Sequence, residues 1–150
     1  MSKSLIALIA AVLLLGSVTL YFQNNREMAD HKMNTPDTSE SKAGDPIASV
    51  TLPDVLEGPA LIGKTAFDAK CAVCHGANAA GQNGVAPPLV HKIYEPSHHG
   101  DESFQIAVAN GVRAHHWKFG NMMPVDGLTR GDVENIVAYV RTLQRANGIN

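Results

Sequence analysis

The chain has 150 residues, a formal net charge of −2 and a pI near 6.4. This balance gives no broad basic field, so nothing indicates a nucleic-acid partner. The two cysteines are too few for the disulfide framework of a small secreted scaffold. There is room for one small domain, of a size that often relies on a bound cofactor or a covalent cross-link.

The N-terminal segment is uncharged and apolar over residues 4–22, SLIALIAAVLLLGSVTLYF. This is long enough to cross a bilayer, and Tyr21 and Phe22 suit the membrane interface. A cleaved signal peptide is the alternative, but no Ala-x-Ala cleavage site follows the apolar run. We therefore expect a single transmembrane signal anchor over residues 1–22, and either interpretation exports the rest of the chain.

The next segment, residues 23–58, is rich in Asn, Asp, Ser, Thr, Glu and Pro and has no sustained period. This composition predicts a flexible, disordered linker. The alternative is that residues 47–56 pack as an extended edge on the domain that follows, residues 59–150.

A helix is predicted over residues 61–73, LIGKTAFDAKCAV. Gly63 lies one turn before Phe67 and would cost helix stability on the order of 1 kcal/mol. Such a glycine indicates that another helix approaches closely. The apolar positions assigned to the buried face are Ile62, Ala66, Phe67 and Cys71.

The helix leads into Cys71-Ala-Val-Cys74-His75, for which three kinds of site are possible. A structural zinc site would need a second pair of ligands, and only histidines could supply it. A thioredoxin-type redox pair would be expected beside parallel strands, which are absent from the pattern. Haem attachment explains all three residues, because the two thiols can form thioethers and the adjacent imidazole can ligate iron.

The other ligand of a haem iron can come from the loop FGNMMPV, where Met122 and Met123 stand between Gly120 and Pro124. Methionine more often fills gaps in an apolar core. That role fits a polar loop poorly, whereas a thioether is a natural sixth ligand of haem iron.

Residues 59–150 resemble the monohaem class I cytochrome c family. The resemblance rests on GKTAFDAKCAVCHG, a Pro-x-Leu element, the Met-Pro loop and a C-terminal helix. It implies one haem c bound through Cys71 and Cys74, with His75 as an axial ligand. Since proline usually follows the ligand methionine in this family, Met123 is favoured over Met122.

In the same family, the carbonyl of a proline twelve residues after the histidine accepts the imidazole N–H, and this position is Pro87. Such a bond fixes the tautomer and orientation of the ring. Ala86 departs from the glycine that the family often has before this proline.

The other predicted helices complete an all-α class, with three main helices wrapped around the haem. Residues 101–110 form a helix with Phe104 and Val108 on one face, and residues 130–147 form a C-terminal helix. Thr129 and Asp132 resemble a capping box at its start, and Gly148 suits its end. Tyr139 is expected to contact the first helix.

The pairs His98-His99 and His115-His116 have several possible roles. They can be ordinary surface residues or the ligands of a second metal ion such as copper or zinc. In addition, His115 or His116 can replace methionine as the axial ligand. Trp117 either donates its indole N–H to a haem propionate or acts as an apolar lid.

These features predict a membrane-tethered electron carrier, not an enzyme, that exchanges single electrons with redox proteins of a respiratory or related chain. In a bacterium, the single-pass anchor would lie in the inner membrane with the haem domain on the periplasmic side. The alternatives are a fixed haem subunit of a larger oxidoreductase, and a sensor or enzyme with a labile methionine. Nothing in the sequence indicates an oligomeric state.

Overall fold

A computed structural model of the chain describes residues 14–19 and 35–150. Residues 14–19 are helical, while the rest of the predicted anchor, and residues 23–34 of the predicted linker, lie outside the described residues. Within the two described ranges, no helix is both long and apolar enough to cross a membrane.

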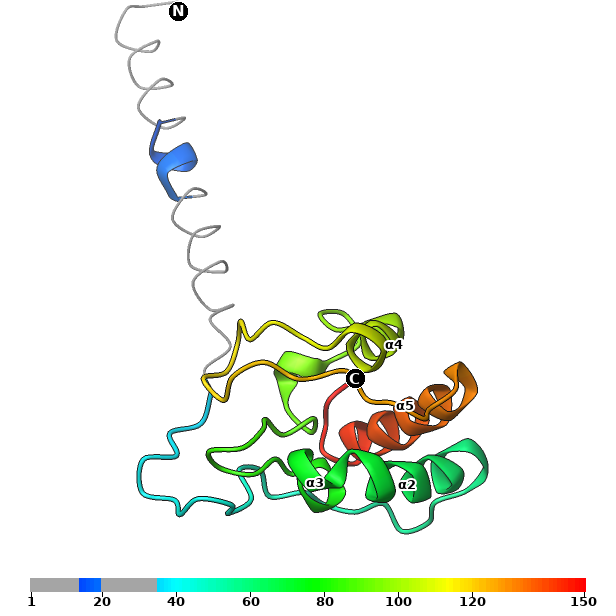
Figure 1. The fold of residues 1–150 in the computed structure, drawn as a ribbon. Helices are drawn as coiled ribbons and strands as arrows, with labels where there is room; N and C mark the ends of the chain where they lie inside the picture. Colours follow the sequence, from blue (N-terminus) through cyan, green and yellow to red (C-terminus); the bar gives the residue numbers. More distant parts are fainter. Residues whose placement is uncertain (1–13, 20–34) are drawn as a thin grey trace, which may run out of the picture. The chain divides into compact units, whose positions relative to one another are not determined.

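The compact unit of residues 35–150 is helical, as predicted (Figure 1). Two isolated β-bridges, and no strands, occur in this part of the chain. The α-helices of this unit are α2 (Gly58–Lys70), α3 (Ala72–His75), α4 (Asp101–Asn110) and α5 (Arg130–Ala146). Two short 3₁₀ turns, η1 (Ala77–Ala79) and η2 (Lys92–Tyr94), lie between α3 and α4.

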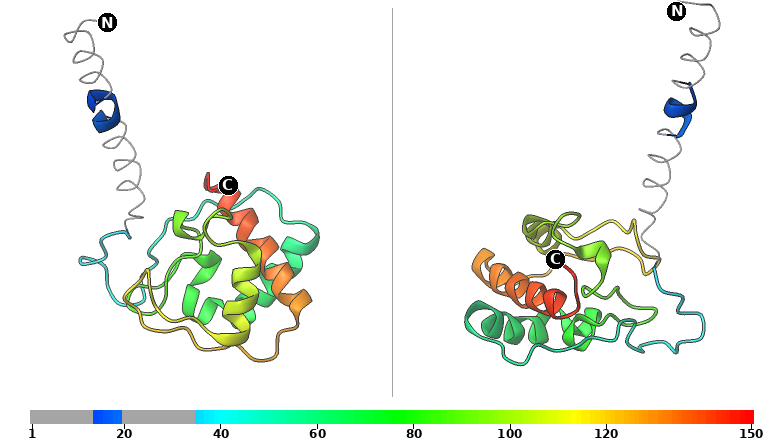
Figure 2. Two further views of the ribbon diagram at one scale, coloured as in Figure 1. Left: turned by 90° about the horizontal axis from the view of Figure 1, so that it is seen from above. Right: turned by 180° about the vertical axis from the view of Figure 1, so that it is seen from behind.

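Helices α2 and α5 lie side by side (Figures 1 and 2) and supply most of the buried hydrophobic core. They approach so closely at Gly63 that a Cβ atom there would lie 1.8 Å from the backbone oxygen of Asn135. One helical turn further on, the rings of Phe67 and Tyr139 meet edge to face with centroids 5.5 Å apart. The close helix approach predicted from Gly63 is confirmed.

The assignment of Ile62 to the buried face of α2 is wrong. Ile62 is 58% exposed, whereas Ala60, Gly63 and Phe67 are buried. The buried stripe of α2 therefore runs one position away from Ile62, because Gly63 has to face α5.

The two ends of α5 agree with the sequence signals. The hydroxyl of Thr129 accepts a hydrogen bond from the Asp132 amide, while the Asp132 carboxylate accepts one from the Thr129 amide. This capping box satisfies backbone groups that the helix itself cannot pair. At the other end the helix stops before Gly148, whose φ of +74° lies in the left-handed region that favours glycine.

Part of the predicted linker differs from a flexible chain, because residues 35–58 belong to the same compact unit as the helices. The amides of Ile47 and Ala48 donate to the carbonyl of Ala80. Thr51 and Asn147 exchange two hydrogen bonds of 2.9 Å. Hydrogen bonds thus hold residues 47, 48 and 51 to the domain, within the range 47–56 for which the alternative interpretation expected packing, although no strand forms there.

The α2/α5 crossing leads to a stability prediction. Gly63→Ala should lower the free energy of unfolding by about 2 kcal/mol or more, because the added methyl group collides with backbone rather than with a movable side chain. Urea or thermal unfolding followed by circular dichroism measures the change.

Gly131→Ala is the matched control for this substitution. A Cβ at Gly131 would meet its nearest atom at 3.9 Å. That variant should be neutral or stabilised by up to about 1 kcal/mol, since alanine is the better helix former. Equal stability of the Gly63→Ala protein and the parent would contradict the proposed crossing.

Candidate functional site

Cys71 caps the start of the short helix α3 and Cys74 lies within it, and both are free thiols. Cys71 is half-buried, and this burial, with the nearby Cys74, raises the pKa of its thiol to about 11. A redox-active cysteine usually has a lowered pKa instead. The thiol of Cys71 therefore does not resemble the reactive cysteine of a thioredoxin-type site.

The imidazole of His75 is held in one orientation. Its Nδ1 lies 2.9 Å from the carbonyl oxygen of Pro87, the pair of atoms that the family resemblance implied. Burial lowers the pKa of His75, and the hydrogen bond to Pro87 opposes this shift only partly. The ring is thus a neutral imidazole with Nδ1–H donated, which leaves the Nε2 lone pair free to bind a metal.

Gln82 is a structural support of this turn that the sequence reasoning missed. Its side-chain amide donates to the carbonyls of Ala72, Val73 and Cys74. The Ala72 carbonyl also accepts from the Gly76 amide, whereas those of Val73 and Cys74 lie at the end of α3 and have no helical partner. Its backbone forms a bridge with Ala86. A glutamine in a polar loop carries no distinctive sequence signal, so only the fold reveals this role.

The methionine loop, residues 120–125, is held by its backbone against the C-terminal end of α4. Met122 and Val112 exchange two hydrogen bonds of 2.9 Å, and the Val125 amide donates to the Val108 carbonyl. Gly111 lies between them with φ +74°, and a Cβ there would be 2.4 Å from the Met122 oxygen. The side chain of Met123 is 74% exposed, so it is free of packing against the protein core.

A cavity of about 960 Å³ joins these parts. Its size lies near the upper end of the range of roughly 300–1,000 Å³ that is common for cofactor sites. The predicted site residues that line it are Cys71, Cys74, His75, Pro87, Trp117, Met122 and Met123. Residues from both halves of the predicted site, about fifty positions apart in the sequence, therefore face one cavity.

Trp117 adds a polar group to the wall of this cavity. Its indole N–H is buried and has no hydrogen-bond partner among the described residues. The Tyr94 hydroxyl lies near the indole but does not meet the geometry of a hydrogen bond with it. Burial raises the pKa of this phenol to about 12, and the nearby indole opposes the rise only weakly. A buried donor without a partner is costly, so this atom fits a ligand that brings an acceptor such as a carboxylate.

The cavity fits a haem. The two thiols suit its vinyl groups, the free Nε2 of His75 suits its iron, and the unpaired indole N–H suits a propionate. In agreement with this chemistry, the family profile described as cytochrome c matches residues 60–144. The chain therefore belongs to the cytochrome c family, whose members are electron-transfer proteins with covalently bound haem c.

Two relatives show how this chain compares with curated proteins. It is 35% identical over 95 residues to cytochrome c-554(547) of Halothiobacillus neapolitanus, covering 58% of this chain and 99% of the relative. It is 29% identical over 117 residues to the cbb3-type cytochrome c oxidase subunit FixP of Azorhizobium caulinodans. That second match covers 67% of this chain but only 36% of FixP.

The tight packing at Gly111 generates a prediction for the methionine loop. Gly111→Ala should move the loop away from α4, because the new Cβ meets backbone at 2.4 Å and the left-handed φ adds strain. We expect the unfolding free energy to fall by about 1–3 kcal/mol and the amides of Val112 and Met122 to exchange faster with deuterium.

Gly120→Ala is the control, because Gly120 also has a positive φ but has nothing within 4 Å of its Cβ position. It should cost only the strain of the left-handed conformation. If the Val112 amide exchanges with deuterium at similar rates in the two variants, close contact with the methionine loop is not the reason that position 111 needs a glycine.

Proposed function

We propose that this protein is a membrane-anchored cytochrome with a single haem c, which carries single electrons between redox proteins of a respiratory or related chain. The observation that carries the proposal is the shared cavity, which both cysteines, His75 and the methionine loop line. The haem supplies a one-electron iron couple, and the chain supplies its attachment, axial ligands and apolar surroundings.

The residues divide this task by their chemistry. The thiols of Cys71 and Cys74 would hold the haem as two thioethers, each S–H adding across one vinyl group so that the hydrogen goes to the neighbouring carbon. His75 would offer Nε2 as one iron ligand, because Nδ1 is engaged with Pro87. Met123 would offer a soft thioether sulfur as the other, with Met122 as the alternative.

Two protein side chains bound to the iron would leave no position for oxygen or a substrate. This favours electron transfer over catalysis. Methionine ligation also raises the reduction potential relative to a second histidine. Trp117 would donate its indole N–H to a propionate, which satisfies a donor that is otherwise unpaired.

Membrane anchoring is supported by the uncharged apolar run of residues 4–22. Thioether attachment of haem takes place outside the cytoplasm, so the haem domain would face the periplasm of a bacterium. Washing membranes with alkaline carbonate separates the two interpretations of the N-terminus: an uncleaved anchor stays in the membrane fraction, whereas a domain released from a cleaved signal peptide is washed off.

A fixed subunit of a larger oxidase is the second candidate function, because one relative is named as a subunit of a cbb3-type cytochrome c oxidase. Stable co-purification of the native protein with an oxidase, at a constant ratio and through size-exclusion chromatography, would favour this function. Recovery of the haem protein alone after mild detergent extraction would favour the mobile carrier.

The assignment of the axial methionine gives a direct test. Met123→Ala should abolish the weak near-infrared band of methionine bound to ferric haem, lower the reduction potential, and allow the ferrous protein to bind carbon monoxide rapidly at neutral pH. Visible and near-infrared spectra with redox titration provide the measurements.

Met122→Ala is the matched control and should retain the band and resist carbon monoxide. The reverse result would assign Met122 as the ligand. Rapid, stoichiometric binding of carbon monoxide by the parent protein would contradict the carrier function, and absence of a covalent haem spectrum after export-competent expression would contradict the cofactor.

Trp117→Phe tests the role of the indole N–H. The ring contacts with His91 and Phe119 should survive, while the hydrogen bond to the propionate is lost. Because a donor stabilises the ionised carboxylate, its removal should raise the propionate pKa. The pH-dependent part of the reduction-potential curve should therefore shift to higher pH.

A Phe119→Leu variant keeps the indole N–H and should leave that pH dependence in place. If Trp117→Phe gives a curve that superimposes on the parent curve, Trp117 serves only as an apolar lid.

A further inference from the structure

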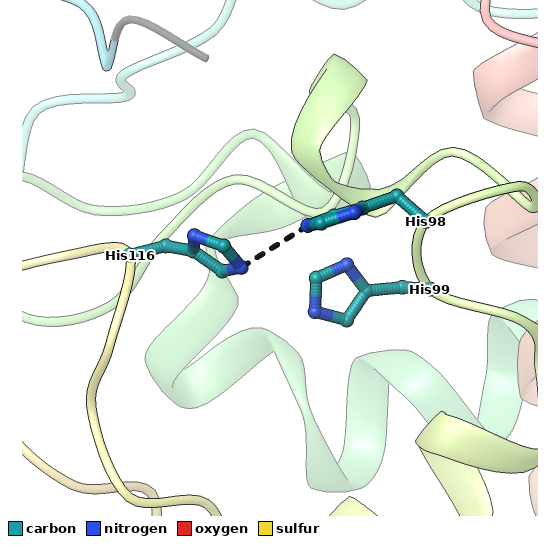
Figure 3. Close-up of side chains that lie close together, drawn as sticks. All are labelled: His98, His99 and His116. Atoms are coloured by element: carbon teal, nitrogen blue, oxygen red, sulfur yellow. Dashed lines mark hydrogen bonds between the residues drawn. The ribbon is translucent and has the colours of Figure 1, made fainter. Parts of the chain in front are cut away.

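Three histidines gather at the edge of the cavity, where His99 and His116 line it and His98 does not, and none of them is a proposed haem ligand. His98 and His99 precede α4, while His116 lies in the loop before the methionine loop (Figure 3). One ring nitrogen of each lies within 4.8 Å of those of the other two. His115 belongs to the same loop but falls outside this three-histidine cluster.

The spacing of one pair in the cluster matches that of two ligands of one metal ion. The Nε2 atoms of His98 and His116 are 3.3 Å apart and face each other (Figure 3). With zinc–nitrogen bonds of 2.0–2.1 Å, two ligands of a tetrahedral ion are about 3.3 Å apart. In this hydrogen bond, one of the two nitrogens carries a proton and the other accepts it. A metal ion that replaces this proton would bind the lone pairs of both nitrogens.

His99 is prepared for the same role by its backbone partner. Its Nδ1 lies 2.6 Å from the carbonyl oxygen of Ile93. An Nδ1–H donated to a carbonyl fixes the tautomer and leaves Nε2 as the free lone pair, which is the usual arrangement of a histidine that binds a metal. The carbonyl of His99 itself accepts from the buried Arg141, so the loop is fixed behind the ring.

The charges around the cluster favour neutral rings. Burial is the main cause that lowers the pKa values of His99 and His116, and the neighbouring histidines lower them further. Neutral imidazoles can bind an ion at neutral pH without first losing a proton. The nearby Arg141 is paired with Asp101 at 2.9 Å, which offsets its repulsion of a cation.

We infer that His98, His99 and His116 form a binding site for a divalent zinc-class metal ion. Three imidazoles leave the fourth tetrahedral position to water, since His98 is exposed and the other two rings are only partly buried. The ion would join the loop before α4 to the loop before the methionine loop. This site is independent of the haem ligands, so it stands even if the function proposed above fails.

The test is a calorimetric titration of the untagged holoprotein with zinc chloride at pH 7.5, because a polyhistidine tag would itself bind zinc. One ion should bind per chain. His98→Gln and His116→Gln should each weaken binding by about 100-fold or more, since even the loss of a group that only supports a metal ligand costs about 10–100-fold. Zinc should also raise the melting temperature of the parent but not of these variants.

His115→Gln is the matched control, because it removes an exposed imidazole from the same loop and leaves the cluster intact. It should retain the parent affinity. An unchanged haem spectrum and circular dichroism show that each variant is folded.

The inference is overturned if the parent protein binds no zinc, or if the His98→Gln/His116→Gln double variant binds it as tightly as the parent, which would place the ion elsewhere. Loss of binding in His115→Gln equal to that in His116→Gln would overturn the assignment of the three ligands. None of these outcomes depends on which methionine ligates the haem.

Discussion

The contact between α2 and α5 at Gly63 is the constraint on which the rest of this structure depends. The absence of a side chain lets the backbones touch, and the distance between the helices then sets where Phe67 meets Tyr139. Because α2 continues into Cys71 and α3, the same contact fixes the start of the haem-attachment motif. One contact between α2 and α5 thus determines both the helix packing and the position of the first cysteine of the site.

The two sides of the cavity are held by different means. On one side, hydrogen bonds to side chains fix the site: His75 to Pro87, and Gln82 to the carbonyls of α3. On the other side, only the backbone of the methionine loop is fixed, against Val108 and Val112, and the Met123 side chain stays exposed. This difference suits a rigid histidine ligand and a methionine that takes its final position on an iron.

The sequence predicted the features that depend on local patterns. The capping residues Thr129 and Asp132 located the start of α5, and Gly63 indicated the helix crossing. The exposure of Ile62 was missed because two neighbouring faces of α2 are both apolar in the sequence. The docking of residues 47–51 was only the alternative interpretation, since backbone carbonyls supply many of its partners and leave no pattern of side chains. The gathering of His98 and His116 depends on how two loops meet in space.

Arg141 gives the histidine loop a stability that its position on the surface would not suggest. Arg141 is 6% exposed, and its guanidinium is paired with Asp101 and donates to the carbonyls of Tyr94 and His99. For this loop to open alone, Arg141 would have to give up its hydrogen bonds to the two carbonyls, and hydrogen bonds to a charged group typically contribute about 1.5–3 kcal/mol each. Local opening is therefore suppressed, and the loop and α5 form one cooperative unit that unfolds together.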